Sequence, residues 1–355
     1  MTLHIFNPDH DLALASGQAN YTAPHAGRQL RHDMGWLPVL WADEGVVLAS
    51  EDSIPNSVAR RFMKESVSLL PLGRELRLAL QSDNDASIEP WGWNAALKAS
   101  LLRIGLPETL MPSDNQIEII RKLSHRSTAA WILPQLNPDK TILAARECHS
   151  EDEVKELLSY HNSLVAKAPW SSSGRGVRFI TSEESLNEPS LSGWLRNTIA
   201  IQGSVMAEPY YNKVKDFAME FVTDGRGNTF YSGLSLFHTG TGGAYTGNII
   251  ATENAKQQAM SRLVSPELLQ DVRQRLCLLT GKLFEGKYSG PFGVDMMVLA
   301  GGILHPCVEL NLRRTMGHVA IALNNRLNAT SDDEIIHSMR IDYNNYKYKL
   351  LIKRI

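Results

Sequence analysis

The sequence predicts a mostly parallel α/β sheet in its first third and strand-rich units after it. Strand-like and helix-like segments alternate over the first third, and this pattern favours a parallel sheet flanked by helices. Farther along, strand-like segments follow one another with fewer helices between them. The chain has 355 residues, enough for two or three domains, and it contains neither an internal repeat nor a low-complexity segment.

The first third is expected to form three strands, two helices and a helical connection to the next domain. The strands are predicted at 3–6, 38–42 and 46–49, and the helices at 56–66, 93–105 and 112–124. Serine residues mark several helix starts. Ser113 precedes Gln116 by three residues, and Ser150 precedes Glu153 by three, which is the spacing of a capping box.

Most of the remaining chain is predicted to form strands. They are expected at 141–148, 163–170 and 177–180 and in the segments VMAEPYY, VKDFAMEFV, NTFYSGLSLF and GPFGVDMMVL. A serine followed by proline opens a long helix at 265–284, and TMGHVAIALNNRL has a helical pattern. The C-terminal YKYKLLIKRI alternates and is rich in lysine, which predicts an edge strand protected by its charges.

Composition excludes several classes of protein. The net charge of −2 gives no broad positive field for nucleic-acid binding. The three cysteines are far apart and form no CxxC pair, so neither a disulfide framework nor a structural zinc site is expected. The N-terminus lacks the pattern of a signal peptide, and no run of about 18 apolar residues predicts a membrane span. We therefore expect a cytoplasmic protein with no nucleic-acid or membrane partner.

Acidic and amide side chains occur in the apolar strand-turn-strand segment at 290–311. Glu309 and Asn311 are two apart on one strand and therefore share a face. With a three-residue turn between the strands, Asp295 lies on that face, one diagonal away from Glu309. A two-residue Gly-Gly turn puts Asp295 on the other face, unless a bulge near Pro306 corrects the register.

Two carboxylates and an amide oxygen on one face suit a hard cation. Magnesium takes oxygen ligands at roughly 2.0–2.1 Å and often shares them with substrate phosphates. The alternative is an ion network with Arg313 and Arg314, which follow directly in the sequence. These residues alone leave both interpretations open.

Lys167 stands in an apolar strand just before the small-residue loop SSSGRG at 171–176. Small residues allow backbone N–H groups to approach phosphate oxygens, and the lysine adds a positive charge. The alternative is a β-hairpin with an edge lysine. The loop is neither a Walker A motif nor a dinucleotide fingerprint, because it lacks GxxxxGK[ST] and lies between two strands.

Two acids border the next strand junction. Glu208 ends one expected strand and Asp216 begins the next. Backbone groups at 207–210 could meet an adenine edge, and Asp216 could accept hydrogen bonds from ribose hydroxyls. The alternative is one solvated acid on each strand.

These motifs, in this order, resemble the ATP-grasp superfamily over roughly residues 120–320. LVAKAPWSSSGRGV resembles its phosphate-loop strand, AEPYYNKVKDF its adenine and ribose segment, and GVDMMV with VELNLRR its magnesium strands. The resemblance implies an α/β and α+β fold. Its parts would be a Rossmann-like pre-ATP-grasp domain at 1–115, a small subdomain with the phosphate loop at 116–205, and a C-terminal subdomain with the magnesium site at 206–355.

The resemblance also implies roles for individual residues. Lys167 would contact ATP phosphates, Glu208 and Tyr210 would lie at the adenine, and Asp216 would lie at the ribose, where a glutamate is commoner. The magnesium ligands would be Asp295, Glu309 and Asn311, with Mn²⁺ as an alternative metal. The flap over the β- and γ-phosphates would consist of Ser171, Ser172, Ser173, Gly174, Arg175 and Gly176.

Besides Asp216, a second residue departs from the family pattern, and two more residues are assigned to the chemistry. The family usually has an earlier helical lysine at the phosphates, and Arg126 stands at about that place here. Arg313 would face the transferred phosphoryl group or the acyl phosphate, on the same strand face as Glu309 and Asn311. His318 would be a base for an incoming amine, with a helix-cap or packing role as the alternative.

The implied reaction is an ATP-dependent ligation. A substrate carboxylate attacks the γ-phosphorus of ATP to give an acyl phosphate, and an amine or a thiol then displaces phosphate. The alternatives are a phosphotransferase acting on a hydroxyl and a nucleotide-binding module without catalysis. Expected partners are ATP, Mg²⁺ and small-molecule or peptide carboxylates and amines, and a homodimer is one option for the oligomeric state.

The substrate residues are left open by the sequence. Asn7, Asp9, His10 and Asp11 follow the first expected strand and could line a substrate site, because ligands bind beyond the carboxyl ends of parallel strands. Simple turn and helix-cap chemistry around Pro8 is the alternative. The Gly/Thr-rich segment 238–248 is either a mobile loop over the acceptor site or a plain connection.

Overall fold

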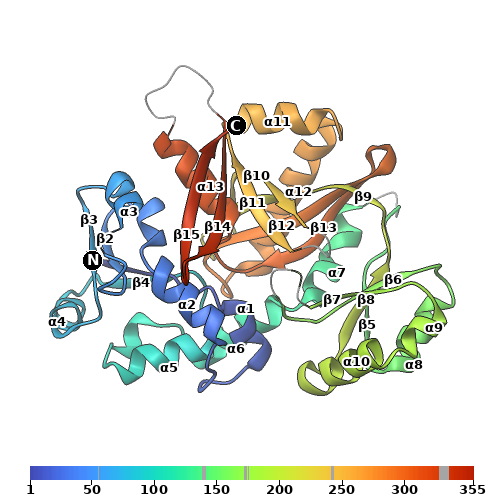
Figure 1. The fold of residues 1–355 in the computed structure, drawn as a ribbon, viewed down its shortest axis with the longest axis horizontal. Helices are drawn as coiled ribbons and strands as arrows, with labels where there is room; N and C mark the ends of the chain where they lie inside the picture. Colours follow the sequence, from blue (N-terminus) through green and yellow to red (C-terminus); the bar gives the residue numbers. More distant parts are fainter. Residues whose placement is uncertain (55, 138–140, 172–173, 175, 241–243, 328–335) are drawn as a thin grey trace. The chain divides into compact units, whose positions relative to one another are not determined.

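The computed structural model describes residues 1–54, 56–137, 141–171, 174, 176–240, 244–327 and 336–355 (Figure 1). The chain divides into two compact units. The first contains residues 1–121, 247–255 and 312–355, and the second contains 122–246 and 256–311. The return of residues 312–355 to the first unit was not foreseen from the sequence. The division at 115 and 205 stays a prediction.

The first unit begins as an alternation of short strands and helices. Its elements up to residue 123 are β1 (Thr2–Ile5), α1 (His10–Ser16), α2 (His25–Met34), the 3-10 helix η1 (Leu37–Leu40), β2 (Gly45–Leu48), α3 (Ser57–Phe62), β3 (Val67–Leu70), α4 (Arg74–Ser82), β4 (Ser87–Pro90), α5 (Ala95–Arg103), the 3-10 helix η2 (Glu108–Leu110) and α6 (Asp114–Leu123).

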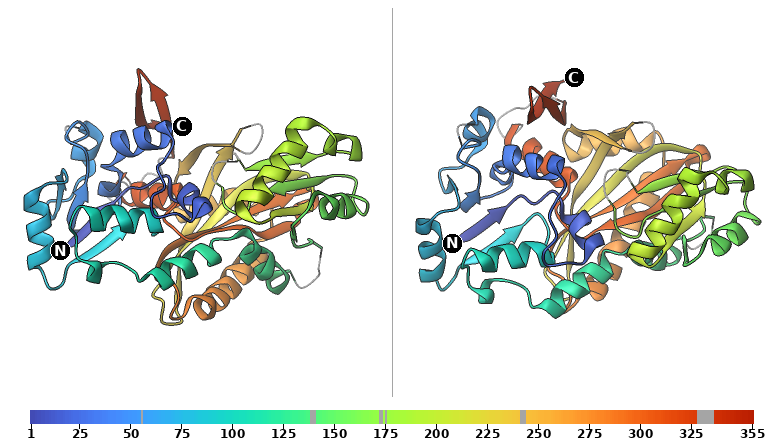
Figure 2. Two further views of the ribbon diagram at one scale, coloured as in Figure 1. Left: turned by 90° about the horizontal axis from the view of Figure 1, so that it is seen from below. Right: turned by 60° about the horizontal axis from the view of Figure 1, so that its bottom comes forward.

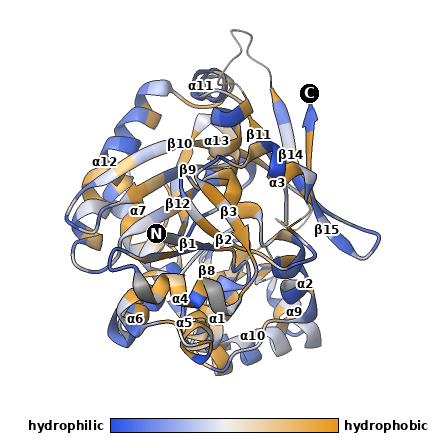
Figure 3. Cartoon of the chain, turned by 90° about the vertical axis from the view of Figure 1, so that its left-hand side faces the viewer, coloured by the Kyte–Doolittle hydropathy of each residue, from blue (hydrophilic) through white to orange (hydrophobic). Residues whose placement is uncertain are grey.

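The four strands of this part form one parallel sheet in the order β3-β2-β1-β4. Leu3 and Ile5 of β1 are almost fully buried, together with Leu80 of α4 and Leu101 of α5. Hydrophobic residues line β2 and β3, as Figure 3 shows by colour. The predicted parallel sheet flanked by helices is therefore confirmed.

Three predicted strands and one predicted helix need correction. Residues 38–42 form no strand, because Pro38 lies in the first turn of the 3-10 helix η1 and a short buried apolar run fits either structure. Only Arg146–Cys148 of the segment 141–148 and only Leu164–Lys167 of the segment 163–170 are strands. The helix predicted at 56–66 is α3, which ends at Phe62.

The later parts of the first unit add an antiparallel ladder and a helix. These elements are β11 (Tyr245–Ile250), the start of α11 (Glu253–Ser261), α13 (Met316–Leu327), β14 (His337–Asn344) and β15 (Lys347–Arg354). β14 pairs with β11 on one side and β15 on the other. β15 is the last strand of its sheet, so the predicted lysine-rich edge strand is confirmed.

The second unit contains two antiparallel groups of strands and their helices. Its elements are α7 (Arg126–Leu136), β5 (Arg146–Cys148), α8 (Glu151–Leu158), β6 (Leu164–Lys167), β7 (Val177–Ile180), α9 (Glu183–Leu186), α10 (Pro189–Gln202), β8 (Val205–Pro209), β9 (Lys213–Thr223), β10 (Thr229–Thr239), α12 (Pro266–Phe284), β12 (Gly290–Leu299), η3 (Ala300–Gly302) and β13 (Leu304–Asn311).

The small sheet has the order β5-β8-β6-β7 and is antiparallel throughout. Helices α8, α9 and α10 gather on one of its faces, as Figures 1 and 2 show. Leu164 and Ala166 of β6 and Val205 and Ala207 of β8 pack in the core with these helices. Because side chains alternate along a strand, Lys167, Met206 and Glu208 project from the opposite face.

The second group of strands runs β13-β12-β9-β10. Phe221 of β9 and Phe292 of β12 stack with ring centroids 5.2 Å apart, and Phe284 of α12 meets Phe292 edge-on. This aromatic cluster fills one face of the strands. The opposite face carries the alternate residues, among them Asp295 and Glu309.

The predicted helix caps are largely confirmed. Ser113 and Gln116 form a reciprocal capping box at α6. The hydroxyl of Ser150 accepts from the N–H of Glu153, whereas the Glu153 carboxylate accepts from the N–H of His149 instead. Within the described residues, no helix is long and apolar enough to cross a membrane.

Candidate functional site

Asp295 and Glu309 lie directly opposite each other on β12 and β13. The turn between the strands is Ala300–Gly302, and the N–H of Leu299 donates to the carbonyl of Ile303 over 2.8 Å. The sequence left a three-residue and a two-residue turn open, and the three-residue turn is the one found. Asp295 was expected one diagonal from Glu309, and this is corrected, because residues 306–308 oppose a single residue of β12 and shift the register.

Asn311 lies on the same face as these two carboxylates. It pairs across the strands with Gly293, which is two residues from Asp295. No three His, Cys, Asp or Glu side chains among the described residues gather into a metal-binding group. A cation at this face would therefore need the amide oxygen of Asn311 beside the carboxylates of Asp295 and Glu309.

The sequence interpretation missed a third carboxylate on this face. Glu220 of β9 pairs with Gly293 and is 1% exposed, and Ala218 of β9 pairs with Asp295. Glu220, Asp295 and Glu309 therefore project from the same side of the sheet. The small residues Gly293, opposite Glu220, and Ala218, opposite Asp295, leave room beside the acids. The missed signal was Glu220 itself, a charged residue inside the apolar strand FAMEFV.

Arg126 connects the acidic face to the loop after β6. It is the first residue of α7, which packs along β13. Its guanidinium lies 2.7 Å from the Glu309 carboxylate, donates to the carbonyl of Ala168 over 2.8 Å, and donates to the hydroxyl of Ser171 over 3.0 Å. One buried cation thus contacts both an expected metal ligand and the start of the expected phosphate loop.

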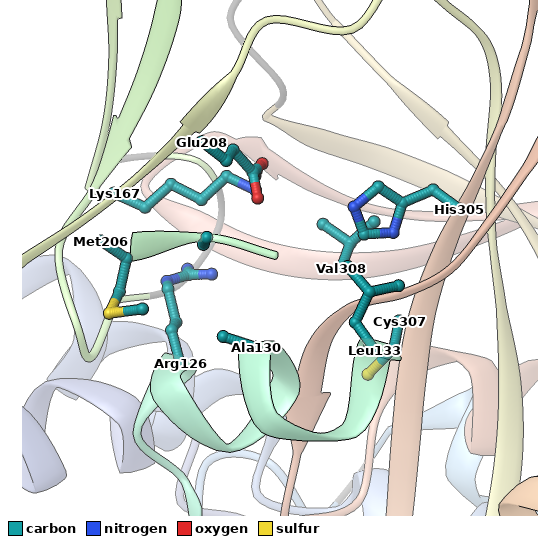
Figure 4. A pocket seen from close by; sticks show the side chains of 10 residues that line it. Arg126, Ala130, Leu133, Lys167, Met206, Glu208, His305, Cys307 and Val308 are labelled. Atoms are coloured by element: carbon teal, nitrogen blue, oxygen red, sulfur yellow. Dashed lines mark ion pairs between the residues drawn. The ribbon is translucent and has the colours of Figure 1, made fainter. Parts of the chain in front are cut away.

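Lys167 and Glu208 form an ion pair on the small sheet. Both side chains are nearly buried, and in Figure 4 they point toward each other from neighbouring strands. Glu208 pairs in register with Val165, so it shares a face with Lys167. The structure brings together these two residues, which the sequence assigned to phosphate and adenine.

A narrow pocket separates this pair from β13. Its volume is about 10 Å³, which is room for about one water. A nucleotide would need the Lys167 and Glu208 side chains to separate and turn toward it. The lining residues are Arg126, Ala130, Leu133, Ala145, Lys167, Met206, Glu208, His305, Cys307 and Val308.

His305 faces the ion pair across this pocket and was missed by the sequence interpretation (Figure 4). It is 1% exposed, and neither ring nitrogen makes a hydrogen bond to a described residue. Burial lowers the pKa of His305 to about 4, with smaller opposing effects from Glu208, which raises it, and Lys167, which lowers it. The imidazole is therefore neutral at neutral pH. A histidine before Pro306 in an apolar strand was the available signal.

The described part of the loop after β6 requires glycine. A Cβ atom at Gly176 would lie 2.4 Å from the side chain of Ser171, and the carbonyl of Gly176 accepts from the N–H of Ala168 over 2.8 Å. Gly174 has a φ of +70°. The predicted flap residues Ser172, Ser173 and Arg175 lie outside the described residues.

The expected ribose and adenine contacts have other partners in the structure. Asp216 pairs with Lys213 at 2.5 Å and accepts from the hydroxyl of Thr239 over 2.8 Å. Tyr210 is 49% exposed, and its ring meets that of Phe179 edge-on. Their roles toward a nucleotide stay predictions.

The expected strand position of Arg313 is wrong. β13 ends at Asn311, and Arg313 lies in a bend of the first unit. Its guanidinium donates three hydrogen bonds of 2.7, 2.9 and 3.0 Å to the carboxylate of Asp11. The sequence could not show this pairing, because the two residues are 302 positions apart.

His318 has the geometry of a helix cap. Its Nδ1 accepts from the backbone N–H of Thr315 over 3.2 Å, and the hydroxyl of Thr315 accepts from the N–H of His318 over 3.3 Å. These bonds close the first turn of α13. They favour the cap role over the predicted role as a base.

No protein-family model and no curated protein matches this sequence. Solved structures do match. The biotin carboxylase domain of a 2-oxoglutarate carboxylase from Hydrogenobacter thermophilus, solved with MgADP and bicarbonate, has a TM-score of 0.54 at 16% identity, over 97% of this chain and 75% of that one.

Two further structures agree in fold. Biotin carboxylase from Campylobacter jejuni has a TM-score of 0.52 at 12% identity, over 98% of this chain and 77% of that one. Phosphoribosylamine–glycine ligase from Thermotoga maritima has a TM-score of 0.51 at 15% identity, over 96% and 80%. The chain has the fold of these enzymes, which confirms the fold expected from the ATP-grasp resemblance.

Proposed function

We propose that this protein is an ATP-dependent ligase that activates a substrate carboxylate as an acyl phosphate and joins it to an amine or a thiol, releasing ADP and phosphate. The observation that carries the proposal is the placement of Arg126. This one side chain contacts both Glu309, opposite Asp295, and the loop that follows Lys167. A site for Mg-ATP needs that combination of acidic and cationic groups, because metal and phosphate bind side by side.

The proposed metal ligands are Asp295, Glu309 and Asn311, for Mg²⁺ or Mn²⁺. The donor set fits a hard cation, since it consists of carboxylate and amide oxygens on one strand face. A bound divalent cation would supply charge neutralisation for the phosphate groups. Glu220, on the same face, is a proposed additional acid that would orient the set rather than complete it.

The proposed phosphate contacts are Lys167, Arg126 and the loop from Ser171 to Gly176. Lys167 would exchange its Glu208 partner for a phosphate oxygen, and this would free Glu208 to face the adenine side with Tyr210. Asp216 remains the proposed ribose contact. In this arrangement the protein contributes positioning and electrostatic stabilisation, which dominate phosphoryl transfer.

The names and bound ligands of the structural neighbours support the reaction class. Phosphoribosylamine–glycine ligase is a ligase by name, and the Hydrogenobacter thermophilus domain was solved with MgADP and bicarbonate. Arg313 remains the proposed contact of the acyl phosphate, in which case Asp11 positions its guanidinium. A cytoplasmic location and a homodimer stay predictions.

The proposal is tested in two steps. Mg-ATP at millimolar concentration should raise the melting temperature, because a ligand bound only by the folded state stabilises it by about 2.7 kcal/mol at a hundredfold excess over Kd. Phosphate release is then measured with pools of amino acids, peptides and other carboxylates, with hydroxylamine added to trap an acyl phosphate as a hydroxamate.

The outcomes separate the alternatives. Hydroxamate and free phosphate with the same carboxylate support the ligase. Loss of ATP with neither product indicates a phosphotransferase acting on a hydroxyl. Binding of Mg-ATP without turnover on any pool indicates a nucleotide-binding module, and the absence of any thermal shift would refute the nucleotide site.

A further inference from the structure

The carboxyl ends of β1 and β4 meet at a change of direction in the parallel sheet of the first unit. From β1 the chain moves outward to β2 and β3, and it then returns to place β4 on the other side of β1. In open parallel sheets, ligands bind beyond the strand ends at such a switch point. Here the segments that follow the two strands begin at Phe6 and Trp91.

These two segments are locked to each other by hydrogen bonds. The side-chain amide of Asn7 donates to the carbonyl of Gly92 over 2.8 Å and accepts from its N–H over 3.3 Å. Asn94 lies 3.2 Å from Nδ1 of His10, and its oxygen already accepts from the N–H of Leu97. The Asn94 amide nitrogen therefore donates to Nδ1, which assigns the ring proton of His10 to Nε2.

The remaining nitrogen of His10 is a buried donor. The residue is 1% exposed, and Nε2 makes no hydrogen bond to a described residue. Burial lowers the pKa of His10 to about 4; the charge of Arg313 also lowers it, whereas the charge of Asp11 and the backbone of Gly92 raise it. The ring is neutral at neutral pH and can offer an N–H group to an oxygen atom beyond the strand ends.

A second set of polar groups gathers around Asp9, next to His10. The Oδ1 atom of Asp9 and the hydroxyl of Tyr21 are both buried, and neither has a hydrogen-bond partner in the described part of the chain. Burial and the nearby charge of Asp9 raise the pKa of Tyr21 to about 12. The Tyr21 phenol is therefore neutral at neutral pH and lies within range of the charge of Asp9.

Helix α2 brings Arg31 to the same place. A Cβ atom on Gly27 would lie 3.8 Å from the Cβ of Asp9, so this face of α2 is directed at Asp9. Arg31 is one turn farther along the same face. Burial lowers the pKa of Arg31, and the charge of Asp9 opposes this effect.

Asp9 and Arg31 are close but do not pair. Among the described residues no ion pair joins them, although each lies within range of the other's charge. The Oδ1 atom of Asp9 is buried and Arg31 is half-buried, and charges that are partly withdrawn from water without a partner destabilise the fold. Such an arrangement is favourable when a ligand with one positive and one negative group bridges them.

We propose that Asp9, Tyr21 and Arg31 form a binding site for an α-amino acid, with the ammonium group at Asp9 and the carboxylate at Arg31. The hydroxyl of Tyr21 supplies a further hydrogen bond to the ligand. This inference rests on the proposed function and deepens it, since it makes an amino acid one of the two substrates of the ligase. Guanidinium suits a carboxylate because it donates two parallel hydrogen bonds.

The test measures binding without nucleotide. The common L-amino acids are screened one at a time by thermal shift, and each hit is compared with the acid that lacks its amino group and the amine that lacks its carboxylate. Binding constants are then measured by calorimetry for the wild type, Arg31→Gln and Asp9→Asn. Arg60→Gln, at an exposed position of α3, is the matched control.

We expect at least one amino acid to bind, and we expect no binding of the acid that lacks its amino group or of the amine that lacks its carboxylate. Arg31→Gln and Asp9→Asn should each weaken that binding by at least about tenfold, and Arg60→Gln should leave it unchanged. The free Arg31→Gln protein should melt no lower than the wild type, because it loses an unpaired charge rather than a structural contact.

Other results overturn the site. If Mg-ATP stabilises the protein but no amino acid binds, the ligase proposal stands and this site falls. If an amino acid binds but the Asp9 and Arg31 variants bind it equally well, the ligand occupies another place. If the acid that lacks the amino group binds as tightly as the amino acid, the site recognises a carboxylate alone and the amino-acid proposal is wrong. Amino-acid binding without any effect of Mg-ATP would keep this site and refute the proposed function.

Discussion

Replacing Arg126 with methionine tests whether one side chain holds the candidate site together. The substitution keeps a long apolar stem in α7 and removes the guanidinium. That group contacts the Glu309 carboxylate at 2.7 Å, the carbonyl of Ala168 at 2.8 Å and the hydroxyl of Ser171 at 3.0 Å. The variant therefore loses one ion pair and two hydrogen bonds at once.

The magnitude follows from burial. Removing one partner of a buried ion pair costs about 3–5 kcal/mol, and a hydrogen bond to a charged group contributes about 1.5–3 kcal/mol. The Arg126 side chain is 7% exposed but that of Glu309 is 23% exposed, so water compensates part of the loss. We expect Arg126→Met to lower the free energy of unfolding by about 2–4 kcal/mol.

The assay is urea unfolding combined with nucleotide titration. Arg196→Met is the control, since Arg196 is exposed and its ion pair with Glu151 is 3.7 Å long. In a double-mutant cycle, Arg126→Met and Glu309→Gln should couple by about 1–3 kcal/mol. Arg126→Met should also weaken Mg-ATP binding by at least about tenfold. A stability within about 0.5 kcal/mol of the control and an unchanged nucleotide affinity would refute the reasoning.

Three further predictions concern single sites. Glu309→Gln should keep the fold but abolish turnover, and turnover near that of the wild type would show that the carboxylate is no essential ligand. The pKa of His305 is about 4 in the folded protein, against its ordinary value of 6.5. As pH falls from 6.5 toward 4, only the unfolded chain takes up this proton, so the free energy of unfolding should fall by up to about 3 kcal/mol. In His305→Asn this part of the acid sensitivity, measured by urea unfolding at neutral and acidic pH, should disappear, and an unchanged pH dependence contradicts the assignment. Arg326 donates to the carbonyls of Leu40, Ala42 and Phe62, so Arg326→Leu should cost about 3 kcal/mol or more in urea unfolding, and a loss no larger than that of an exposed arginine contradicts a structural role.

The sequence predicted the site where its chemistry is local. Glu309 and Asn311 share a face because they are two residues apart, and a three-residue turn was enough to bring Asp295 to the same side. The exact register was missed because it depends on the bulge at residues 306–308, which only the pairing of complete strands determines. Periodicity gives faces reliably, whereas register needs the partner strand.

Sequence reasoning failed where contacts are distant or where a residue type is ambiguous. Residues 38–42 were assigned to a strand because a short apolar run fits a strand and a 3-10 helix equally well. Glu220 was passed over because nothing in its neighbourhood marks it, and only its pairing with Gly293 of the central strand places it on the face that carries Asn311. His305 was passed over in the same way, since its burial and its charged neighbours Glu208 and Lys167 come from segments far away in the sequence.

The partner of Arg313 is determined by the point at which the chain leaves the second unit and enters the first. As a continuation of β13 it would have extended the row of Glu309 and Asn311, but the strand ends at Asn311 and the chain enters the first unit. There the N–H of Arg314 donates to the carbonyl of Trp91 over 2.8 Å, at the end of β4, and Arg313 grips Asp11 beyond the end of β1. The segment that follows the acidic strand is thus anchored at the switch point of the parallel sheet. Asp9 of the proposed amino-acid site stands two residues before Asp11, the partner of Arg313, so a ligand bound at Asp9 would lie against the segment that holds the Arg313 guanidinium.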